Sequence, residues 1–490
     1  QRQMCIRDRC ISYILVEELI LHYADKAFEG YKIEEKALMR VTRNADIDID
    51  EGFDSELDFR QNMSELINKR KRLCPVRLQL SKQISDTVLN ELLSRLELSE
   101  KQVFVEKTPL DMSYVFAVFD KASDRKELFF PKQEPQPSAM IDPSRSMIEQ
   151  IDEKDLFLHY PYESIKPFIR LLDEAAKDES VTSIKMTLYR VAKNSKVIKA
   201  LCNAAENGKD VLVLVELRAR FDEENNIVWA KMLEKAGCHV IYGLVGLKTH
   251  SKITLVVRRE DTGIRRYVHL ATGNYNDSTA KLYTDCGIFT CDERFGEDAT
   301  AVFNMLSGYS EPKNWNRLIV APIWMKDRFL KLIEREAEHA KKGMPAMIVA
   351  KMNSLCDPKI IAALYHASSC GVQIYLLIRG ICCLRVGIPG VSENIHVRSI
   401  VGNFLEHSRI FYFHNNGSDE IYMGSADWMP RNLDRRVEIV FPVEDEQIKN
   451  EIKHVLDLEF RDNVKAHILQ PDGTYEKQDK RGKLLINSQM

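Results

Sequence analysis

Residues 196–208 read KVIKALCNAAENG, and residues 359–371 read KIIAALYHASSCG. The two stretches align without a gap at an offset of 163 residues (359 − 196), from a shared lysine to a shared glycine. Both have the apolar spacing of a helix, and a strand-like apolar run follows each, VLVLV at 211–215 and IYLLI at 374–378. A repeat of this length indicates duplication of a whole domain rather than a solenoid.

The sequence around the first copy alternates between strand-like and helix-like segments. In chain order these are SIKMTLYRV at 183–191, the helix-like stretch at 196–208, VLVLVEL at 211–217, NIVWAKMLEKAG at 226–237 and HVIYGLV at 239–245. Such alternation predicts a sheet covered by helices. The plan starts again near EPKNWNRLIVAPIW, at 311–324. We therefore predict an α/β fold with two repeated domains, at residues 137–315 and 316–490.

Residues 10–130 have a different pattern. They combine a helix-like opening, ISYILVEELILHYADKAF at 11–28, with short alternating strands such as ALMRVTRNADIDID at 37–50 and SYVFAVFD at 113–120. This mixture predicts an α+β head domain. The segment FFPKQEPQPSAMIDPSRS, at 129–146, is rich in proline, serine and charge and is typical of a linker.

The first nine residues, QRQMCIRDR, do not continue into the pattern that follows. We interpret them as an artefact of cloning or sequence assembly rather than as part of the fold. The chain then opens in the middle of a helix-like pattern. We therefore expect that a natural N-terminal region is missing.

The composition is that of a soluble globular protein, with 44% apolar and 29% charged residues among 490. No run of about 18 apolar residues occurs, which argues against a transmembrane segment. Eleven cysteines without a C-x-x-C pair argue against a disulfide framework and a structural zinc site, and we expect a reducing, cytoplasmic environment. A net charge of −3 shows no overall excess of positive charge, which nucleic-acid binding would favour.

A histidine and a cation recur in the two halves. LKTHSKITLVV at 247–257 contains His250 and Lys252, and NFLEHSRIFYF at 403–413 contains His407 and Arg409. A polar glycine segment follows each, ATGNYN at 271–276 and MGSADW at 423–428, and then an acid that enters another strand, Asp285 or Glu438. A single histidine is usually a surface or hydrogen-bonded core residue. Duplication of the histidine–cation pair favours a functional site.

This set of residues suits phosphoryl chemistry. A neutral imidazole is a nucleophile, and its second nitrogen needs an acceptor, which Asp285 or Glu438 can supply. Lys252 and Arg409 can neutralise phosphoryl oxygens. Further arginines stand at predicted strand ends, where open α/β sheets bind ligands; these are Arg190, Arg218, Arg220 and Arg379. The pattern therefore predicts a phosphoryl or phosphodiester site, although any one of these arginines is as easily a surface ion-pair residue.

Standard nucleotide motifs are missing. GLVGLKTH resembles a P-loop, but Leu247 separates Gly246 from Lys248. The protein-kinase motifs are also absent. The repeat and the His-x-cation motif resemble the phospholipase D superfamily, whose motif is H-x-K-x4-D. The chain departs from that motif, because Val257 and His414 stand where the two aspartates are expected.

The chain more closely resembles the ATP-dependent polyphosphate kinases, a long bacterial family with two phospholipase D-like C-terminal domains. The resemblance is carried by RVTRNADIDID, MTLYRVA, LVELRARFDEENN, GLKTHSK, ATGNYN, LYTDCGIFT, FLEHSRI and GSADWMPRNLDRRVE, which occur in the family's order from about residue 10 to the end. It implies reversible transfer of the ATP γ-phosphate to the end of an inorganic polyphosphate chain, with ATP or ADP and polyphosphate as partners.

The resemblance also implies roles for individual residues. His250 is expected to carry a phosphohistidine intermediate, His407 to assist it, and Glu438 and Asp285 to support the two histidines, with the pairing left open. Mg²⁺ is expected as the cofactor, with Arg190 and Arg220 at its site. Because a guanidinium has no lone pair to offer a metal, we interpret these arginines as phosphate clamps beside the ion. The ATP contacts implied are Tyr283, Arg379 and His407, with Arg409 beside them.

The resemblance also implies a further N-terminal helical domain that contacts adenine, and we expect that this domain is missing here. The head domain implies a homodimer or a higher homo-oligomer. Two rival hypotheses are a phosphodiesterase of the phospholipase D type, acting through His250 without a nucleotide, and a non-catalytic polyanion-binding protein. Val257 and His414 count against the first, and retention of both histidines, both acids and the arginines counts against the second.

Overall fold

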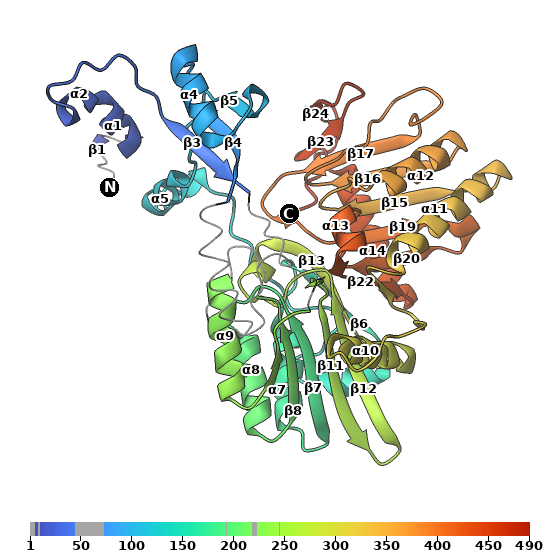
Figure 1. Ribbon diagram of the computed structural model, residues 1–490. Helices are drawn as coiled ribbons and strands as arrows, with labels where there is room; N and C mark the ends of the chain where they lie inside the picture. Colours follow the sequence, from blue (N-terminus) through green and yellow to red (C-terminus); the bar gives the residue numbers. More distant parts are fainter. Residues whose placement is uncertain (1–4, 8–9, 45–72, 193, 218–222, 245) are drawn as a thin grey trace. The chain divides into compact units, whose positions relative to one another are not determined.

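The structure is a computed structural model that describes residues 5–7, 10–44, 73–192, 194–217, 223–244 and 246–490. The chain divides into two compact units, Gln1–Lys132 and Gln133–Met490. Figure 1 labels the helices and strands of both. Residues 129–146, the expected linker, contain no helix or strand.

The N-terminal unit is built on a three-stranded sheet in the order β3-β4-β5. β3 (Met39–Arg43) runs antiparallel to β4 (Pro75–Leu80), and β4 runs parallel to β5 (Val103–Val105). Leu78 and Leu80 of β4 form a small core with Leu93 of α4 (Asp86–Leu96). A mixed sheet with a packed helix confirms the predicted α+β character.

Two predictions for this unit need correction. SYVFAVFD was expected as a strand, but Tyr114–Lys121 form the helix α5. A short apolar run carries no clear period, and the side chains of Val115, Phe116 and Phe119 are exposed rather than alternately buried. The helix-like stretch at 11–28 contains two short helices, α1 (Val16–His22) and α2 (Ala24–Ala27), after the strand β2 (Cys10–Ser12).

The second unit contains the two predicted repeats, which confirms the α/β fold class. The first repeat forms a sheet in the order β18-β13-β12-β11-β7-β8-β9, with β6 beside β13. Its elements are α6 (Met147–Glu153), β6 (Leu156–Tyr160), α7 (Lys166–Lys177), β7 (Val181–Leu188), α8 (Lys196–Glu206), β8 (Asp210–Val215), α9 (Glu223–Lys235), β9 (His239–Ile241), β10 (Lys248–Thr249), β11 (Ile253–Glu260), β12 (Gly263–Ala271), β13 (Tyr283–Thr290) and α10 (Glu293–Leu306).

The second repeat forms a sheet in the order β14-β22-β20-β19-β15-β16-β17-β23-β24. Its elements are β14 (Ile319–Val320), α11 (Met325–Lys341), β15 (Met347–Met352), α12 (Pro358–Ser369), β16 (Gln373–Ile378), β17 (Ile395–Ile400), β18 (Leu405–Glu406), β19 (Ile410–Phe413), β20 (Glu420–Gly424), α13 (Pro430–Asp434), β21 (Arg436–Val437), β22 (Ile439–Val443), α14 (Glu446–Arg461), β23 (Ala466–Leu469) and β24 (Tyr475–Lys477).

The 163-residue offset between the aligned stretches also separates equivalent helices and strands of the two repeats. β8 and β16 occupy residues 163 positions apart, and the helix before each strand, α8 or α12, ends at the shared glycine turn. Both glycines, Gly208 and Gly371, have positive φ angles of 81° and 102°, a conformation that costs glycine little. The strands β7-β8-β9 and β15-β16-β17 are parallel in both copies.

One hydrophobic core joins the two repeats. Alternate residues of a strand point to opposite faces of its sheet. In β12, His269 packs against Phe168 of α7, whereas Val268 and Leu270 face the other way. Those two belong to a cluster that also contains Phe303 of α10 and Phe441 of β22. Burying such a side chain contributes about 1.5–3 kcal/mol, so this shared core stabilises the contact between the repeats.

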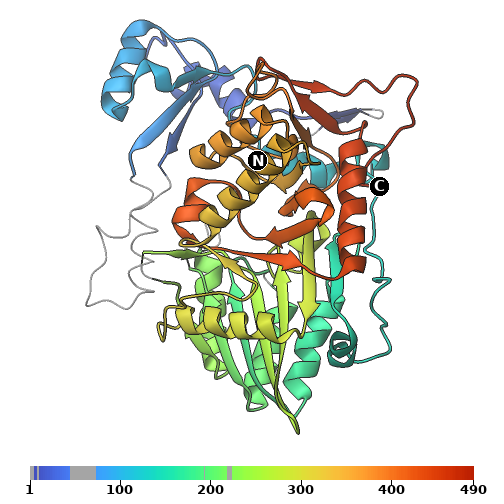
Figure 2. The same ribbon diagram turned by 90° about the vertical axis from the view of Figure 1, so that its right-hand side faces the viewer.

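Figure 2 shows the second repeat, orange to red, above the first, green to yellow. The far face of the second sheet packs in a separate cluster with α11 and α12. Within the described ranges, no helix has the length and apolar character needed to cross a membrane.

Candidate active site

Two short pairs of strands connect the repeats at the site. β10 of the first repeat pairs in parallel with β21 of the second, and β18 of the second pairs in parallel with β13 of the first. Each pair ends at a predicted site residue on both strands. The first ends at His250 and Glu438, and the second at His407 and Asp285. The backbone thus places each histidine beside the acid of the other repeat.

His250 lies against Glu438. Its Nδ1 is 2.9 Å from both carboxylate oxygens, and its backbone N–H donates to the carbonyl of Val437 at 2.9 Å. The carboxylate also accepts hydrogen bonds from Ser425 and Asn432, so it is held in one orientation. A carboxylate accepts from Nδ1–H, which leaves the lone pair of the imidazole on Nε2. The geometry therefore places the lone pair of the His250 imidazole on Nε2.

His407 and Asp285 repeat this arrangement. Nδ1 of His407 lies 2.9 and 2.8 Å from the two carboxylate oxygens of Asp285. Thr272 donates to that carboxylate at 2.7 Å, in the place that Ser425 takes beside Glu438. The sequence left open which acid supports which histidine. In the structure each histidine contacts the acid of the other repeat, His250 with Glu438 and His407 with Asp285.

Lys252 and Arg409 also occupy equivalent positions. Lys252 donates from Nζ to the backbone carbonyl of His250, and Arg409 donates to that of His407 at 2.7 Å. Arg409 further donates to Asp427 at 3.2 Å. Both cationic side chains are buried, 2% and 3% exposed, directly behind the histidines. They contribute positive charge to the site and hold the two histidine loops.

The electrostatics keep the histidines neutral. Burial lowers the pKa of His250 well below its ordinary value, and the nearby charges of Lys252 and Arg436 act in the same direction. Burial also lowers the pKa of His407, and the negative charge of Asp285 opposes that shift only in part. An uncharged imidazole is the form that can act as a nucleophile.

The two acids differ from each other. Burial raises the pKa of Glu438 above its ordinary value, against the opposing charges of Lys252 and Arg436. Burial alone would do the same to Asp285, but His407 and Arg409 bring the pKa of Asp285 below its ordinary value. The carboxylate beside His407 is therefore more firmly ionised than the carboxylate beside His250.

The residues expected around ATP lie near His407. The ring of Tyr283 is 5.2 Å from the imidazole of His407, measured between centroids. Arg379 is half-buried and donates to Asn353 at 2.7 and 3.0 Å. Asn353 in turn donates from its backbone to Asp427 at 2.7 Å, and Asp427 also binds Arg409. This chain of contacts brings Arg379 and Arg409 into one network.

Sequence reasoning missed several residues of this site. Asn353 and Asp427 link Arg379 to Arg409, and the ring of Tyr189 meets the imidazole of His250 edge-on, with centroids 4.8 Å apart. The motif MTLYRVA contained Tyr189, and MGSADW contained Asp427, so both stood inside segments already singled out. Asn353 lies directly after β15 at the end of an apolar run, where the strand-end rule could have found it.

The residues expected at a magnesium site are only partly within the described part of the chain. The guanidinium of Arg190 lies 5.8 Å from the ring centre of Tyr189, and Arg220 falls within 218–222, outside the described residues. Among the described side chains, no group of three or more histidines, cysteines, aspartates or glutamates can hold a metal ion. Glu438 and Asp285 are already bound to histidines. The described donor set does not fit a protein-held Mg²⁺.

The positions that distinguish the phospholipase D motif lie outside the two histidine–acid pairs. Val257 is a residue of β11, and His414 follows β19, where its Nδ1 lies 3.0 Å from Asp419. The acids that support the histidines here come instead from β13 and from the residue between β21 and β22.

Comparison with known proteins agrees with these observations. Family models match along nearly the whole chain: the polyphosphate kinase middle domain at residues 2–118, C-terminal domain 1 at 146–312 and C-terminal domain 2 at 318–489. The polyphosphate kinase of Halalkalibacterium halodurans is 50% identical over 94% of this chain and 66% of its own length. That of Bacillus anthracis is 47% identical over 98% of this chain and 68% of its own length.

A solved structure gives the same assignment. The polyphosphate kinase of Porphyromonas gingivalis superimposes with a TM-score of 0.80 at 32% identity, covering 100% of this chain and 72% of that one. The chain spans about two thirds of the length of the curated relatives that it matches. The crossed histidine–acid pairs, the family models and these relatives together show that the chain belongs to the polyphosphate kinase family.

Proposed function

We propose that this chain catalyses the reversible transfer of the terminal phosphate of ATP to the end of an inorganic polyphosphate chain, through a phosphohistidine at His250. The observation that carries the proposal is the contact of His250 Nδ1 with Glu438, which leaves Nε2 as the lone-pair nitrogen in a buried, positively charged site. The names of the relatives support the choice of ATP and polyphosphate as substrates.

The first step forms a nitrogen–phosphorus bond. Nε2 of His250 attacks the γ-phosphorus of ATP, and the bond from that phosphorus to the bridging oxygen of ADP breaks, so that ADP leaves with the electron pair. The imidazole becomes positively charged as it reacts, and the carboxylate of Glu438 at Nδ1 stabilises that charge. Arg409, together with Lys252 below its pKa of about 7, supplies a positive field for the transferred oxygens, because phosphoryl transfer is catalysed mainly by positioning and electrostatics.

The second step reverses these bond changes with a new acceptor. A terminal oxygen of polyphosphate attacks the phosphorus, and the bond to Nε2 breaks, which restores neutral His250 and lengthens the chain by one phosphate. His407, oriented by Asp285, lies near the nucleotide residues Tyr283 and Arg379 and can hydrogen-bond the leaving or entering oxygen. The overall reaction breaks one phosphoanhydride and forms another of similar energy, so the same site makes ATP from polyphosphate and ADP. Magnesium enters as part of the nucleotide substrate.

We also propose that the chain self-associates through its N-terminal unit. Large apolar side chains are exposed there, including Tyr31 at 81% and Phe116 at 76%. Exposed apolar side chains gathered on one unit are typical of an interaction surface. Light scattering of the purified chain tests this, with a mass near twice 56.6 kDa as the expected result and a monomer as the contrary one.

The activity is tested in both directions with the whole chain. Incubation with Mg-ATP should yield acid-insoluble polyphosphate, and incubation with polyphosphate and ADP should yield ATP, measured by luciferase. His250→Ala is expected to abolish both reactions. Release of inorganic phosphate from ATP without polyphosphate, or cleavage of phosphodiesters without any nucleotide, would contradict the proposal and favour a hydrolase.

A further inference from the structure

A cavity lies away from the two histidines. It has a volume of about 860 Å³ and is formed by residues 313–319, the start of α11 and the ends of β20 and β22. Small-molecule sites typically occupy 300–1,000 Å³. Glu438 directly precedes β22, whereas Pro442 and Val443 at the other end of that strand line the cavity. At about 3.3 Å per residue, the part of the wall formed by Pro442 and Val443 lies about 15 Å along β22 from Glu438, whereas Ile319 of the wall pairs with Val440 and lies nearer.

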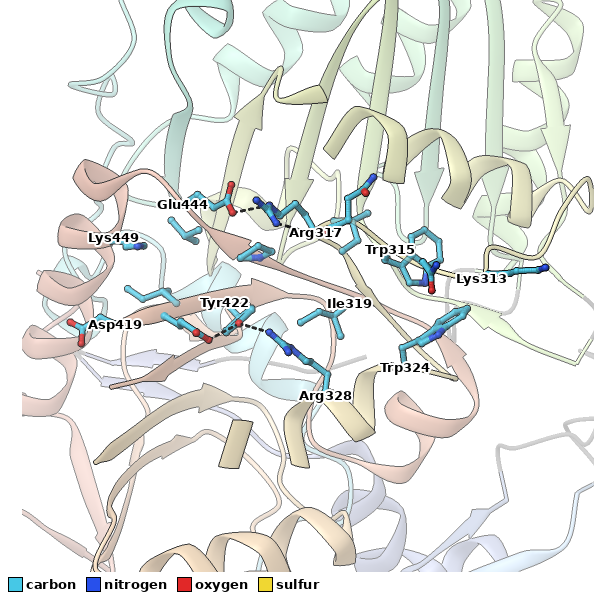
Figure 3. A pocket seen from close by; sticks show the side chains of 17 residues that line it. Lys313, Trp315, Arg317, Ile319, Trp324, Arg328, Asp419, Tyr422, Glu444 and Lys449 are labelled. Atoms are coloured by element: carbon cyan, nitrogen blue, oxygen red, sulfur yellow. Dashed lines mark hydrogen bonds and ion pairs between the residues drawn. The ribbon is translucent and has the colours of Figure 1, made fainter. Parts of the chain in front are cut away.

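The cavity has an aromatic end and a basic middle. Figure 3 shows Trp315 and Trp324 at one end, Lys449 at the other, and Arg317 and Arg328 between them. The two indoles meet edge to face with centroids 5.6 Å apart, and both are only partly buried. An elongated ligand with a flat ring at one end and negative charge along its length matches this order of side chains.

The acids on the cavity wall do not cancel its positive charge, because cations outside the wall already neutralise them. Lys453 binds Asp419 at 2.5 Å, and Arg335 binds Glu420 at 2.7 Å. Glu444 accepts from Arg294 at 2.8 Å as well as from Arg317 of the wall at 2.8 Å.

Two wall cations, Lys313 and Arg328, form no ion pair with a carboxylate in the part of the chain that the structure describes. Arg328 donates to the hydroxyl of Tyr422 at 3.4 Å, and its charge also acts on the nearby Glu420, which Arg335 already neutralises. The cavity also receives the N-terminal end of α11, since Trp324 is both the N-cap residue of that helix and part of the wall. A helix N-terminus carries partial positive charge and favours phosphate groups. The wall is therefore electropositive.

We propose that this cavity binds a nucleoside diphosphate or triphosphate at a second site, separate from His250. The base would stack on one of the two indoles, Trp315 or Trp324, and meet the other at its edge, and the phosphates would bind Arg317 and Arg328. Stacking on an indole accepts any base, so the site selects for a nucleoside phosphate without choosing among bases. ADP and GDP should therefore bind with similar affinity.

Intrinsic fluorescence gives a direct test, because two of the four tryptophans of the chain line the cavity. The probe is ADP without magnesium, titrated into the Arg379→Ala variant, in which the nucleotide site near His407 is weakened. We expect a saturable change in fluorescence. Arg328→Ala in that background should raise the Kd about tenfold or more, since it removes a charge-assisted contact. Arg461→Ala, which alters an exposed arginine at the far end of α14, should leave the Kd unchanged.

The outcomes separate this proposal from the proposed function. A titration without fluorescence change in Arg379→Ala, or an equal Kd in Arg328→Ala, overturns the second site. Tripolyphosphate that binds as tightly as ADP, with adenosine contributing nothing, overturns the role of the indoles. Arg328→Ala should still acquire phosphate on His250 from ATP, so failure of that reaction in the unaltered chain bears on the proposed function alone.

Discussion

Nδ1 of His250 lies 2.9 Å from both carboxylate oxygens of Glu438, a residue 188 positions further along the chain. His407 makes the equivalent contact with Asp285, which comes 122 positions before it. Neither repeat therefore contains a complete histidine–acid pair of its own. Docking of the two repeats through their shared core completes both pairs at once, which explains why a duplicated fold gives a single site.

The crossed pairing predicts different effects for two conservative changes. Glu438→Gln should slow the formation of phosphohistidine at His250 about 10²- to 10⁴-fold, because an amide no longer fixes the proton on Nδ1. Asp285→Asn should leave this first step within a few fold and slow the later transfer to polyphosphate. Single-turnover labelling with γ-labelled ATP measures the first step, and a chase with polyphosphate measures the second.

The control for that comparison is Glu446→Gln, which removes an exposed carboxylate at the start of α14. It should behave as the unaltered chain in both steps. If Asp285→Asn blocked labelling of His250 and Glu438→Gln did not, the crossed assignment would be wrong.

Lys252 predicts a pH dependence of stability. Burial lowers its pKa to about 7 in the folded chain, from an ordinary value near 10.5. Between these values the unfolded chain binds a proton that the folded chain does not, so the free energy of unfolding rises with pH across this window. The slope is at most about 1.4 kcal/mol per pH unit. Urea unfolding at pH 7, 8, 9 and 10 should show this rise in the unaltered chain relative to Lys252→Met.

The quantity to measure is the difference in free energy of unfolding between the unaltered chain and Lys252→Met, because other groups titrate in both proteins. Lys209→Met is a suitable comparison, since its ammonium group contacts only a backbone carbonyl near the surface. Parallel stability curves for Lys252→Met and the unaltered chain from pH 7 to 10 would mean that Lys252 remains protonated throughout.

Gln489 predicts a remote effect on His407. Its side chain is 1% exposed, donates to Glu406 and to the carbonyl of Phe404, and accepts from the N–H of Phe404 at 2.9 Å. Glu406 accepts from Thr284 at 2.8 Å, and the Thr284 hydroxyl accepts from the backbone N–H of His407. These contacts position the loop of His407 from behind.

Gln489→Ala should therefore reduce the free energy of unfolding by about 1–3 kcal/mol, because it leaves buried polar groups without partners. It should also lower kcat for polyphosphate synthesis more than it raises KM for ATP. Gln470→Ala, which loses only a contact within its own turn, is the matched control. Loss of stability with unchanged kcat in Gln489→Ala would assign Gln489 a purely structural role.

Much of the second unit could be predicted from its sequence. The aligned stretches at 196–208 and 359–371 gave a helix and a following strand in each repeat, at the offset that the structure has. The spacing of apolar residues is enough to predict these elements, because each of them packs one face against a large core. The stretch SYVFAVFD gave the wrong element, since helix α5 leaves its apolar side chains exposed and no core imposes a period on them.

The candidate site was predicted as a set of residues but not as an arrangement. Asp285 follows His250 by 35 residues and Glu438 follows His407 by 31, so the sequence offered two similar local pairings. Parallel pairing of β10 with β21 and of β13 with β18 decides which acid meets which histidine. β10, β18 and β21 have only two residues each, too few to leave a periodic signal in the sequence. Asn353 and Asp427 were missed for the same reason, because their roles depend on contacts between distant strand ends.

The most direct test of the account is the position of the phosphate after incubation with Mg-ATP labelled at the γ-phosphate. The unaltered chain, His250→Ala and His407→Ala are compared by intact mass and by the acid lability of the label. We predict an acid-labile, alkali-stable phosphate that is absent only from His250→Ala, with transfer to polyphosphate slowed in His407→Ala. A label that persists in His250→Ala and disappears in His407→Ala would contradict the assignment of the nucleophile.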